Sequence, residues 1–506
     1  METHPDTPLP LWDNGCGPGA SLTPADENYS TVFGGISVRV AWNVPEMKIK
    51  QVSVTELFGV FDHVIPFNMD EHITIIHGSN GLGKTALLRM INGLFNNRYS
   101  ELRSIPFLAF QIYFDNGASI RIKRSSDAKE DESKSKLSQQ GLVAEITHTP
   151  GEMPTLIELG GPRRIEEMRM LLHYLDNVVA GVERIGQDQW RVHPTGETLS
   201  SEDLVERYWD HIPSHVLKEL ELPPLAGDSS QGRDWLNHIT SQIDVRFIET
   251  QRLVAWSRTG RKRGYEPTDR MTPVVAMYSE ELATIIQKKF SEYAGLSQSL
   301  DQTFPRRVIY RDLGATLSLE ELRDKLKSLD EKRERLTEAG LLEKEPHFFA
   351  FEGVPTSIDD VTRSVLSVYA ADMDKKLSVF NDVTDKIELV KQFVKDHFLQ
   401  KELLVSKEKG FTLKSTKTDQ PLEPTQLSSG EQHELVLLYE LLFRIKPNSL
   451  ILIDEPEISL HVDWQTRFLE DLKNVIRLSP FDALIATHSP QIINTRWDLT
   501  VELEAK

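Results

Sequence analysis

The chain has 506 residues, of which 39% are hydrophobic and 27% charged, a composition typical of globular proteins with room for two or three packed units. No apolar run approaches the length of a membrane span, and the N-terminus lacks the basic patch and apolar core of a secretory signal. The single cysteine, Cys16, excludes an internal disulfide. The net charge of −19 argues against nucleic-acid binding by the whole surface. Together these features predict a cytoplasmic protein.

The N-terminal part of the chain predicts a tail followed by strands. Residues 1–30 are rich in Pro, Gly, Asp and Thr without any period, which is typical of a flexible tail. Residues 36–40 and 49–57 have strand-like patterns and lead to an apolar run at residues 73–76. This run predicts a buried parallel strand.

A glycine-rich loop follows the apolar run. It has the pattern G-x-x-x-x-G-K-T and consists of Gly78, Ser79, Asn80, Gly81, Leu82, Gly83, Lys84 and Thr85. Apolar residues at helical spacing come next, so the loop has the strand-to-helix context of a P-loop. Its glycines let backbone N–H groups close around phosphate oxygens, and the helix N-terminus adds partial positive charge. Lys84 can reach the β- and γ-phosphates of a nucleotide, and Thr85 can place its hydroxyl on Mg²⁺.

The segment after the P-loop predicts an antiparallel sheet and then helices. The apolar runs 107–114 and 118–123 flank an Asn-Gly pair, which is a strong hairpin signal. Residues 124–140 are polar and predict a mobile loop. Residues 162–240 predict helices broken by polar loops.

A short strand-like run at residues 245–252 places Gln251 near its end, and a basic segment follows. From Arg252 to Arg270, six Lys and Arg stand against two acidic residues, a net charge of 6 − 2 = +4. A solvated loop is the favoured interpretation, and contact with DNA or RNA phosphates is the alternative.

Long amphipathic helices are predicted between residues 278 and 404. One apolar stripe consists of Val361, Val365, Val368, Phe380, Val383 and Ile387, and a second of Leu319, Leu322, Leu326 and Leu329. Because the heptad is not sustained over the many turns of a long coiled coil, a compact helical bundle is favoured over a short antiparallel arm.

The C-terminal quarter carries three further motifs. The first, Ser428, Ser429 and Gly430, precedes an apolar helix and would form its N-terminal end, a second anion site.

The other two motifs end apolar strands. The run at residues 450–453 leads into Asp454 and Glu455, at the edge of a sheet where α/β proteins bind ligands. Asp454 is placed to hold Mg²⁺, and Glu455 to orient and polarise an attacking water. The run at residues 483–487 ends in His488.

Four motifs in this order resemble those of ABC-type ATPases. In that family the signature motif, here at Ser428, touches the γ-phosphate bound on the opposing subunit, and a histidine at the position of His488 senses the γ-phosphate. The family also uses a glutamine at a strand end to ligate Mg²⁺ and the attacking water. Gln251 is preferred for this role over Gln111, which sits inside a strand-like run. An aromatic residue within 58–61 could stack on adenine, although a core position is the favoured interpretation.

The spacing of the motifs separates branches of that family. From Lys84 to Ser428 is 428 − 84 = 344 residues, which resembles the SMC, RecF and OLD branch, where a helical arm or insert splits the head into two lobes. Residues 454–461 and 486–493 look most like OLD and RecF-like ATPases, and residues 427–442 resemble PtuA, the ATPase subunit of Septu antiphage systems and retron-linked relatives. The chain departs from the transporter pattern at Ser429 and at His461, whose role is therefore open.

The resemblance implies an α/β P-loop ABC-type ATPase head of two lobes with a large helical insert. The expected organisation is a flexible tail at 1–30, an N-terminal ATPase lobe at 31–255, a helical insert or short coiled-coil arm at 256–405, and a C-terminal ATPase lobe at 406–506. OLD proteins carry a TOPRIM nuclease domain after the ATPase. Only 506 − 488 = 18 residues follow His488, so no such domain is expected here.

The function implied is that of an ATPase subunit of an antiphage defence complex. It would bind ATP and Mg²⁺, form a homodimer or higher oligomer through the ATP sandwich, and control a separate HNH-type, PtuB-like nuclease without cutting nucleic acid itself. One alternative is a RecF- or SMC-like DNA repair or maintenance ATPase. The other is a nucleotide switch that restrains a non-nuclease or TOPRIM effector.

Overall fold

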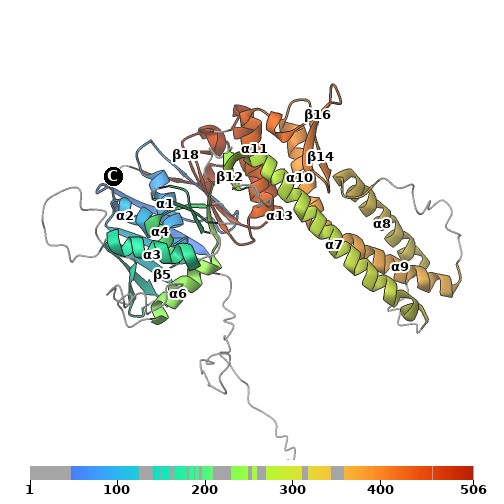
Figure 1. Cartoon of the computed structure of the whole chain (residues 1–506), viewed down its shortest axis with the longest axis horizontal. Coiled ribbons are helices and arrows are strands. Elements are labelled where there is room, and N and C mark those ends of the chain that lie inside the picture. The colour runs from blue at the N-terminus through green and yellow to red at the C-terminus, as the bar shows by residue number, and fades with distance from the viewer. Residues whose placement is uncertain are drawn as a thin grey trace, which may run out of the picture. The chain divides into compact units, whose positions relative to one another are not determined.

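A five-stranded parallel sheet combines strands from the N-terminal and C-terminal parts of the chain (Figure 1). The computed structural model describes residues 47–124, 141–149, 151–159, 165–178, 182–186, 188–192, 197–208, 230–248, 254–258, 269–309, 317–343, 358–458 and 460–504. The sheet has the order β11–β17–β18–β3–β19. Its strands are, in that order, Val245–Ile248, Leu450–Asp454, Asp482–Thr487, Ile73–His77 and Thr500–Glu502.

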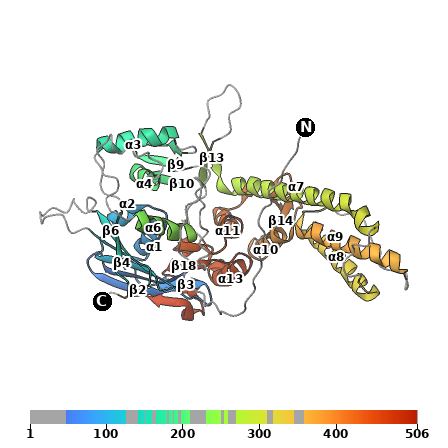
Figure 2. The same ribbon diagram turned by 90° about the horizontal axis from the view of Figure 1, so that it is seen from below.

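Both faces of this sheet are buried, which explains its continuous apolar runs. Leu450 and Leu452 on β17 face a core that includes helix α1 (Lys84–Phe95), whereas Ile451 and Ile453 face a second core. The second core includes α11 (Ser429–Tyr439) and α13 (Phe468–Leu478). Alternate side chains of each strand therefore pack on opposite sides, with α1 on one side and α11 and α13 on the other (Figure 2).

A six-stranded antiparallel sheet shares the core of α1. Its order is β2–β1–β4–β5–β6–β7, and the predicted hairpin is confirmed as β4 and β5. The left-handed Gly117 (φ 87°) makes the turn. The strands are β1 (Ile49–Leu57), β2 (Phe61–Pro66), β4 (Ala109–Phe114), β5 (Ser119–Arg124), β6 (Leu142–Thr147) and β7 (Thr155–Leu159), accompanied by α2 (Tyr99–Ser104) and α6 (Ser230–Gln242).

The helices predicted over residues 162–240 are present, but the segments between them are not only polar loops. A small sheet lies within this segment, with its own core that includes Leu171, Trp190 and Leu199. Strands of three or four residues are too short to show a period in the sequence, so the helical patterns around them dominated the prediction. The segment contains α3 (Ile165–Val178), β8 (Val182–Arg184), β9 (Gln189–Val192), β10 (Glu197–Ser200) and α4 (Ser201–Arg207).

Among the described residues, four helices lie in the insert between the two parts of the parallel sheet. Its α8 begins with the capping box of Ser318 and Glu321 and ends at the left-handed Gly340. The stripe predicted from Val361 to Ile387 is divided between α9 and α10, and Val361 itself is 62% exposed. The helices are α7 (Val274–Ile309), α8 (Leu319–Ala339), α9 (Asp360–Ser378) and α10 (Asn381–His397).

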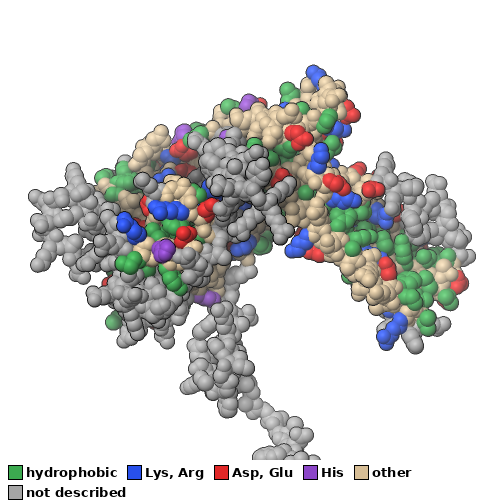
Figure 3. Space-filling model, in the orientation of Figure 1, with side chains coloured by type: hydrophobic (Ala, Val, Ile, Leu, Met, Phe, Trp, Pro, Cys, Tyr) green, Lys and Arg blue, Asp and Glu red, His purple; other side chains and the backbone are tan. Residues whose placement is uncertain are grey.

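Ion pairs accompany the apolar contacts between these helices. Lys325 and Lys332 of α8 both pair with Asp374 of α9, and Arg335 of α8 pairs with Asp385 of α10. Acidic and basic side chains are correspondingly interspersed on the viewed face of the molecule (Figure 3). Among the described residues, no helix is long and apolar enough to cross a membrane.

A short antiparallel sheet connects the insert to the C-terminal helices. Its strands are β14 (Lys401–Ser406), β15 (Gly410–Ser415) and β16 (Pro421–Leu422). Ser279 of α7 donates a hydrogen bond to the Lys409 carbonyl (2.6 Å) and accepts one from the Phe411 amide (3.2 Å). Strands β12 (Val254–Arg258) and β13 (Asp269–Pro273) pair with each other. The remaining short elements are the 3₁₀ turns η4 (Pro424–Gln426), η6 (Pro456–Ile458) and η7 (Trp497–Leu499), the π-helical η5 (Glu440–Arg444), and the helices α12 (Val462–Gln465) and α14 (Pro490–Ile493).

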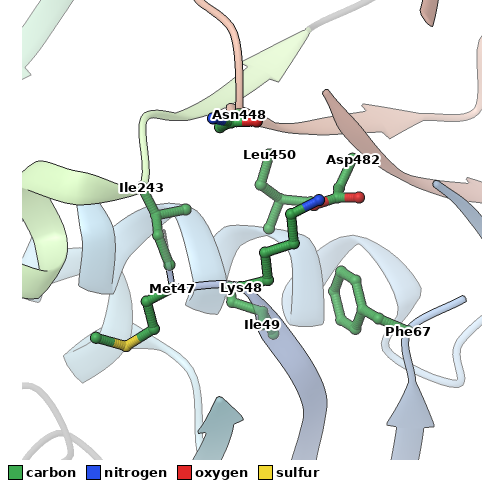
Figure 4. Close-up of a pocket in the computed structure, with 8 residues that line it drawn as sticks. All are labelled: Met47, Lys48, Ile49, Phe67, Ile243, Asn448, Leu450 and Asp482. Carbon is green, nitrogen blue, oxygen red and sulfur yellow. The ribbon is translucent and has the colours of Figure 1, made fainter. Parts of the chain in front are cut away.

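A small cavity lies at the amino-terminal edge of the parallel sheet. Leu450 and Asp482, at the starts of β17 and β18, line it together with Phe67 and Ile243 (Figure 4). Its volume is about 10 Å³, which is room for roughly one water. A larger ligand must therefore bind elsewhere, and the polar motifs lie at the opposite edge of the sheet.

Several sequence predictions fall on residues outside those described. These are the tail at 1–30, the strand at 36–40, most of the polar loop at 124–140, residue Gln251, and most of the basic segment Arg252 to Arg270.

We predict that Gly410→Ala destabilises the fold. A Cβ on Gly410 would lie 1.7 Å from the Ser279 carbonyl oxygen, and the residue has a left-handed φ of 70°. The free energy of unfolding should fall by about 2–4 kcal/mol, measured from urea unfolding followed by circular dichroism. Gly295 on α7 is the matched control because nothing lies within 4 Å of its Cβ position. Gly295→Ala should stabilise by about 0.5–1 kcal/mol, and equal midpoints for the two variants would contradict the packing of Gly410 on α7.

Candidate functional site

The polar motifs meet because β17, β18 and β3 are neighbouring parallel strands. In the register of the sheet Asp454 pairs with Ala486, and Thr487 pairs with His77. The carboxyl ends of the three strands therefore lie at one edge. The P-loop, the two carboxylates and His488 follow directly from these ends, which is the usual place for a ligand in an open α/β sheet.

The P-loop glycines have backbone conformations that other residues rarely adopt. Gly78, Gly81 and Gly83 have φ of 151°, 90° and 89°. A Cβ on Gly78 would lie 2.8 Å from the Leu503 carbonyl oxygen, and one on Gly83 would lie 2.4 Å from a Leu57 methyl carbon. The loop is thus confined on two sides, while the position of Gly81 is open. Helix α1 starts without a side-chain cap, so its first amide groups remain available to an anion.

Lys84 is held over the P-loop. Its side chain is largely buried, with 5% exposed, and its Nζ donates hydrogen bonds to the carbonyl oxygens of Gly78 (2.8 Å) and Ser79 (3.2 Å). The ammonium group is therefore positioned over the loop, where the loop amides and α1 also favour negative charge.

Thr85 and Asp454 contact each other across 369 residues of sequence. The Thr85 hydroxyl donates to Asp454 Oδ1 at 3.2 Å. Burial raises the pKa of Asp454, and the nearby Glu455 carboxylate adds to this shift while the Thr85 hydrogen bond opposes it. A cation beside Asp454 would offset the cost of its buried charge. A hydroxyl and a carboxylate are also the hard oxygen ligands that Mg²⁺ prefers, so the residues fit this ion.

Glu455 lies at the turn that follows β17. Its φ of 44° is left-handed, and its amide donates to the Ala486 carbonyl at 2.8 Å. Few non-glycine residues adopt this conformation, and such residues cluster at functional sites. The Glu455 carboxylate lies 3.7 Å from Nδ1 of His488, so the structure brings these two predicted residues together.

Glu457 is a site residue that the sequence analysis missed. Its carboxylate oxygen Oε1 accepts hydrogen bonds from the Thr487 hydroxyl (2.7 Å) and the His488 amide (2.9 Å), and it lies 3.1 Å from Nδ1 of His488. The only sequence signal was its place three residues after Asp454, in a run already assigned to that motif.

The second anion site predicted at Ser428 is a capped helix end. Ser428 is the N-cap of α11 and forms a capping box with Glu431, as expected of a helix start. Lys401 of β14 donates to Glu431 at 2.7 Å. Burial alone would raise the pKa of Glu431, but the hydrogen bonds from Lys401 and Ser428 lower it overall. Ser428 is exposed and Gly430 is partly exposed, and nothing lies within 4 Å of a Cβ placed on Gly430.

His461 lies against the helix that Ser428 begins. Glu434 of α11 is 4% exposed, and its Oε1 lies 3.5 Å from the His461 amide. The His461 side chain accepts a hydrogen bond from the Asp463 amide and so caps α12. His461 therefore has a local structural role, and Glu434 links the segment after Asp454 to α11.

Aromatic side chains border the P-loop. Phe58 is 44% exposed, and its ring edge lies 3.3 Å from the Cβ position of Gly83. His63 Nε2 contacts the Leu82 carbonyl oxygen at 2.9 Å, and its ring stacks on Phe61. Phe58 therefore lies at the surface beside the P-loop, so the core position favoured for residues 58–61 is wrong for this residue.

A surface hollow of about 450 Å³ lies beside the P-loop. It is lined by His77, Gly78, Ser79, Asn80, His488, Pro490, Ile493 and Trp497. The P-loop and His488 therefore share one solvent-accessible space.

The glutamine prediction is not tested by the structure, because Gln251 lies outside the described residues. Its strand β11 ends at Ile248 beside β17, near the carboxyl edge. The rival Gln111 lies in β4 of the antiparallel sheet and pairs there with Ser53 and Arg121.

Comparison with known proteins matches residues 291–494 to a family model described as "AAA domain, putative AbiEii toxin, Type IV TA system". This match includes Ser428, Asp454 and His488 but not the P-loop. No curated protein matches the sequence.

Three similar solved structures contain SMC heads. The Pyrococcus furiosus Smc head with an extended coiled coil, bound to the C-terminal domain of ScpA, is 11% identical, with a TM-score of 0.29 and coverage of 91% of this chain and 94% of that one. The Thermotoga maritima SMC head is 12% identical, with a TM-score of 0.28 and coverage of 88% of this chain and 91% of that one. An SmcHead bound to the C-winged helix domain of ScpA is 10% identical, with a TM-score of 0.30 and coverage of 88% of this chain and 91% of that one.

The chain has a P-loop ATPase fold with a helical insert. The N-terminal part of the chain contributes strand β3, the P-loop and α1 to this fold, and the C-terminal part contributes β17 with Asp454. The expected α/β fold class is therefore confirmed.

We predict that Glu434 makes stability depend on pH. Burial raises its pKa to about 7 from 4.5, so its contribution to stability is full below pH 4.5 and is lost as the pH rises through 7. Glu434→Gln removes this ionisation. Its free energy of unfolding, relative to that of wild type, should therefore rise by about 2 to 3 kcal/mol when the pH is raised from 5 to 8. Urea unfolding at both values tests this. The exposed Glu334→Gln is the control for loss of one charge, and an equal pH response in both variants would contradict the prediction.

Proposed function

We propose that the chain binds ATP at the carboxyl edge of the parallel sheet and hydrolyses it. The observation that carries this proposal is the 3.2 Å hydrogen bond between Thr85 and Asp454, because it joins the end of the P-loop to the carboxylate strand. The two-lobed head, with residues 31–255 and 406–506 as its lobes and 256–405 as its insert, is part of the same proposal.

The P-loop residues bind the phosphates. Backbone amides from Gly78 to Thr85 and the start of α1 surround the phosphate oxygens, and the Lys84 ammonium faces the β- and γ-phosphates. Thr85 and Asp454 would hold Mg²⁺, which neutralises charge on the phosphate oxygens when bound. Phe58 would stack on the adenine ring.

Glu455 and His488 act at the terminal phosphate. Glu455 orients a water molecule and accepts its proton, since its carboxylate is only partly exposed and lies beside the P-loop hollow through its contact with His488. His488 contacts the γ-phosphate from the same hollow. Gln251 is proposed as a further ligand of Mg²⁺ and water.

The second copy of the chain completes each site. The N-terminus of α11 consists of the exposed Ser428 and Ser429 and the partly exposed Gly430, and its dipole favours anions. Each copy would present this helix end to the nucleotide on the other, so that ATP lies between two chains in a two-fold dimer.

We propose that this ATPase belongs to an antiphage defence complex and controls a separate HNH-type nuclease. The resemblance of residues 427–442 to PtuA supports the role. The matching family model is described as an AAA domain of a toxin from a type IV system. This description supports a second candidate function, in which the chain is a nucleotide switch that restrains a toxin. In both cases the ATP-bound and ATP-free states present different surfaces to a partner.

Two variants test nucleotide binding and turnover separately. Lys84→Ala removes the charge that faces the phosphates, so calorimetry should show ATP affinity lowered by about 100-fold or more. Glu455→Gln keeps the shape but accepts no proton, so it should bind ATP within a few-fold of wild type and hydrolyse it about 10²- to 10⁴-fold more slowly. Wild-type affinity in the first variant, or wild-type turnover in the second, would refute the assigned role.

A mixing experiment tests the composite site. Lys84→Ala and Ser428→Arg homodimers should both be inactive, whereas a heterodimer of the two retains one intact site. Mixed samples, with heterodimers confirmed by mass spectrometry, should recover part of the hydrolysis. Absence of recovery would mean that each site is built within one chain.

The division of labour with a nuclease is tested with the purified chain. Plasmid, oligonucleotide and tRNA should remain intact with Mg²⁺ or Mn²⁺, with or without ATP. Where an HNH-type protein is encoded beside this gene, adding it should produce cleavage that ATP changes. Cleavage by the chain alone that disappears in Asp454→Ala would place a nuclease inside this chain.

A further inference from the structure

Glu457 makes contacts that go beyond capping a strand. One carboxylate oxygen, Oε1, accepts from the Thr487 hydroxyl and the His488 amide and also faces the His488 ring at Nδ1. The first two contacts fix the backbone at the end of β18. The third fixes the side chain that lines the hollow beside the P-loop.

The burial of Glu457 is costly. Its side chain is 7% exposed, and its second oxygen, Oε2, is buried with no hydrogen-bond partner among the described residues. An unpartnered buried oxygen loses its hydration without a hydrogen bond in return. The carboxylates of Asp454 and Glu455 are close enough to influence the same region, so a third negative charge adds repulsion. A structural cap could be neutral, which makes the charge itself informative.

The contact with His488 determines which ring nitrogen is free. A carboxylate oxygen only accepts hydrogen bonds, and Nδ1 of His488 lies 3.1 Å from Oε1, so a hydrogen on Nδ1 is favoured over a lone pair facing that oxygen. The amide and Nδ1 of His488 are then both engaged with Glu457, and Nε2 is the ring atom left for a ligand in the hollow.

We propose that Glu457 is a positioning residue for hydrolysis: it holds the His488 ring and fixes the hydrogen on Nδ1, so that Nε2 is directed to the nucleotide. This inference rests on the proposed ATP hydrolysis at the same site. Glu457 touches neither the nucleotide nor water and acts only through His488.

A double-mutant cycle tests the proposal in the full-length chain. Glu457→Gln keeps the size and one acceptor oxygen but removes the charge. It should lower kcat by about 10-fold or more, with ATP affinity by calorimetry within about 3-fold of wild type. In the His488→Ala background, Glu457→Gln should cause no further loss of kcat in single-turnover measurements. An equal loss in both backgrounds, or wild-type kcat in Glu457→Gln, would overturn the proposal.

A second readout does not depend on turnover. In ¹⁵N-histidine spectra, with the His488 signal assigned by its loss in His488→Ala, wild type should show a hydrogen on Nδ1 and Glu457→Gln should shift toward the other tautomer. Thr487→Val is the matched control, because it removes a contact to the same oxygen and leaves the ring contact. It should retain the wild-type tautomer, and a spectrum like that of Glu457→Gln would indicate a purely structural role. If wild type hydrolyses no ATP, the proposed function fails, while the spectra still decide the tautomer.

Discussion

The register of neighbouring parallel strands is the constraint on which the site depends. Because β3, β18 and β17 end at one edge, side chains from both ends of the chain meet there, and Thr85 bonds to Asp454 at 3.2 Å. Each strand is buried on both faces, so a shift of one residue would place its side chains in the wrong core. The packing that stabilises the sheet therefore also fixes the positions of the polar groups at its edge.

The insert is connected to this edge through a continuous series of contacts. Ser279 on α7 bonds to the β14–β15 hairpin, Lys401 on β14 pairs with Glu431, and Glu431 caps the same helix end as Ser428. Glu434 on that helix lies beside the His461 amide in the segment after Asp454. These contacts give the helical insert a physical route to the proposed nucleotide site. Any coupling along that route would require two arrangements of these elements with different affinity for ATP.

Motifs defined by local pattern could be predicted from the sequence. The P-loop, the Asn-Gly hairpin and the Ser428 helix start each depend on residues within about ten positions, and each lies where expected. Glu457 could not be predicted, because its contacts with Thr487 and His488 follow only from the β17–β18 pairing and the intervening turn η6. The small sheet β8–β9–β10 was missed because its strands are too short for a period. The roles assigned to Gln251 and to the partner nuclease stay predictions.

The central claim is that Thr85 and Asp454 form one Mg²⁺–nucleotide site from the two ends of the chain. Calorimetric titration of ATP into wild type and Asp454→Asn, each with Mg²⁺ and with a chelator, tests it most directly. Mg²⁺ should tighten ATP binding to wild type. Asp454→Asn should lose most of that gain while binding metal-free ATP as wild type does, because the P-loop remains intact. An Asp454→Asn protein that retains the full Mg²⁺ dependence would contradict the account.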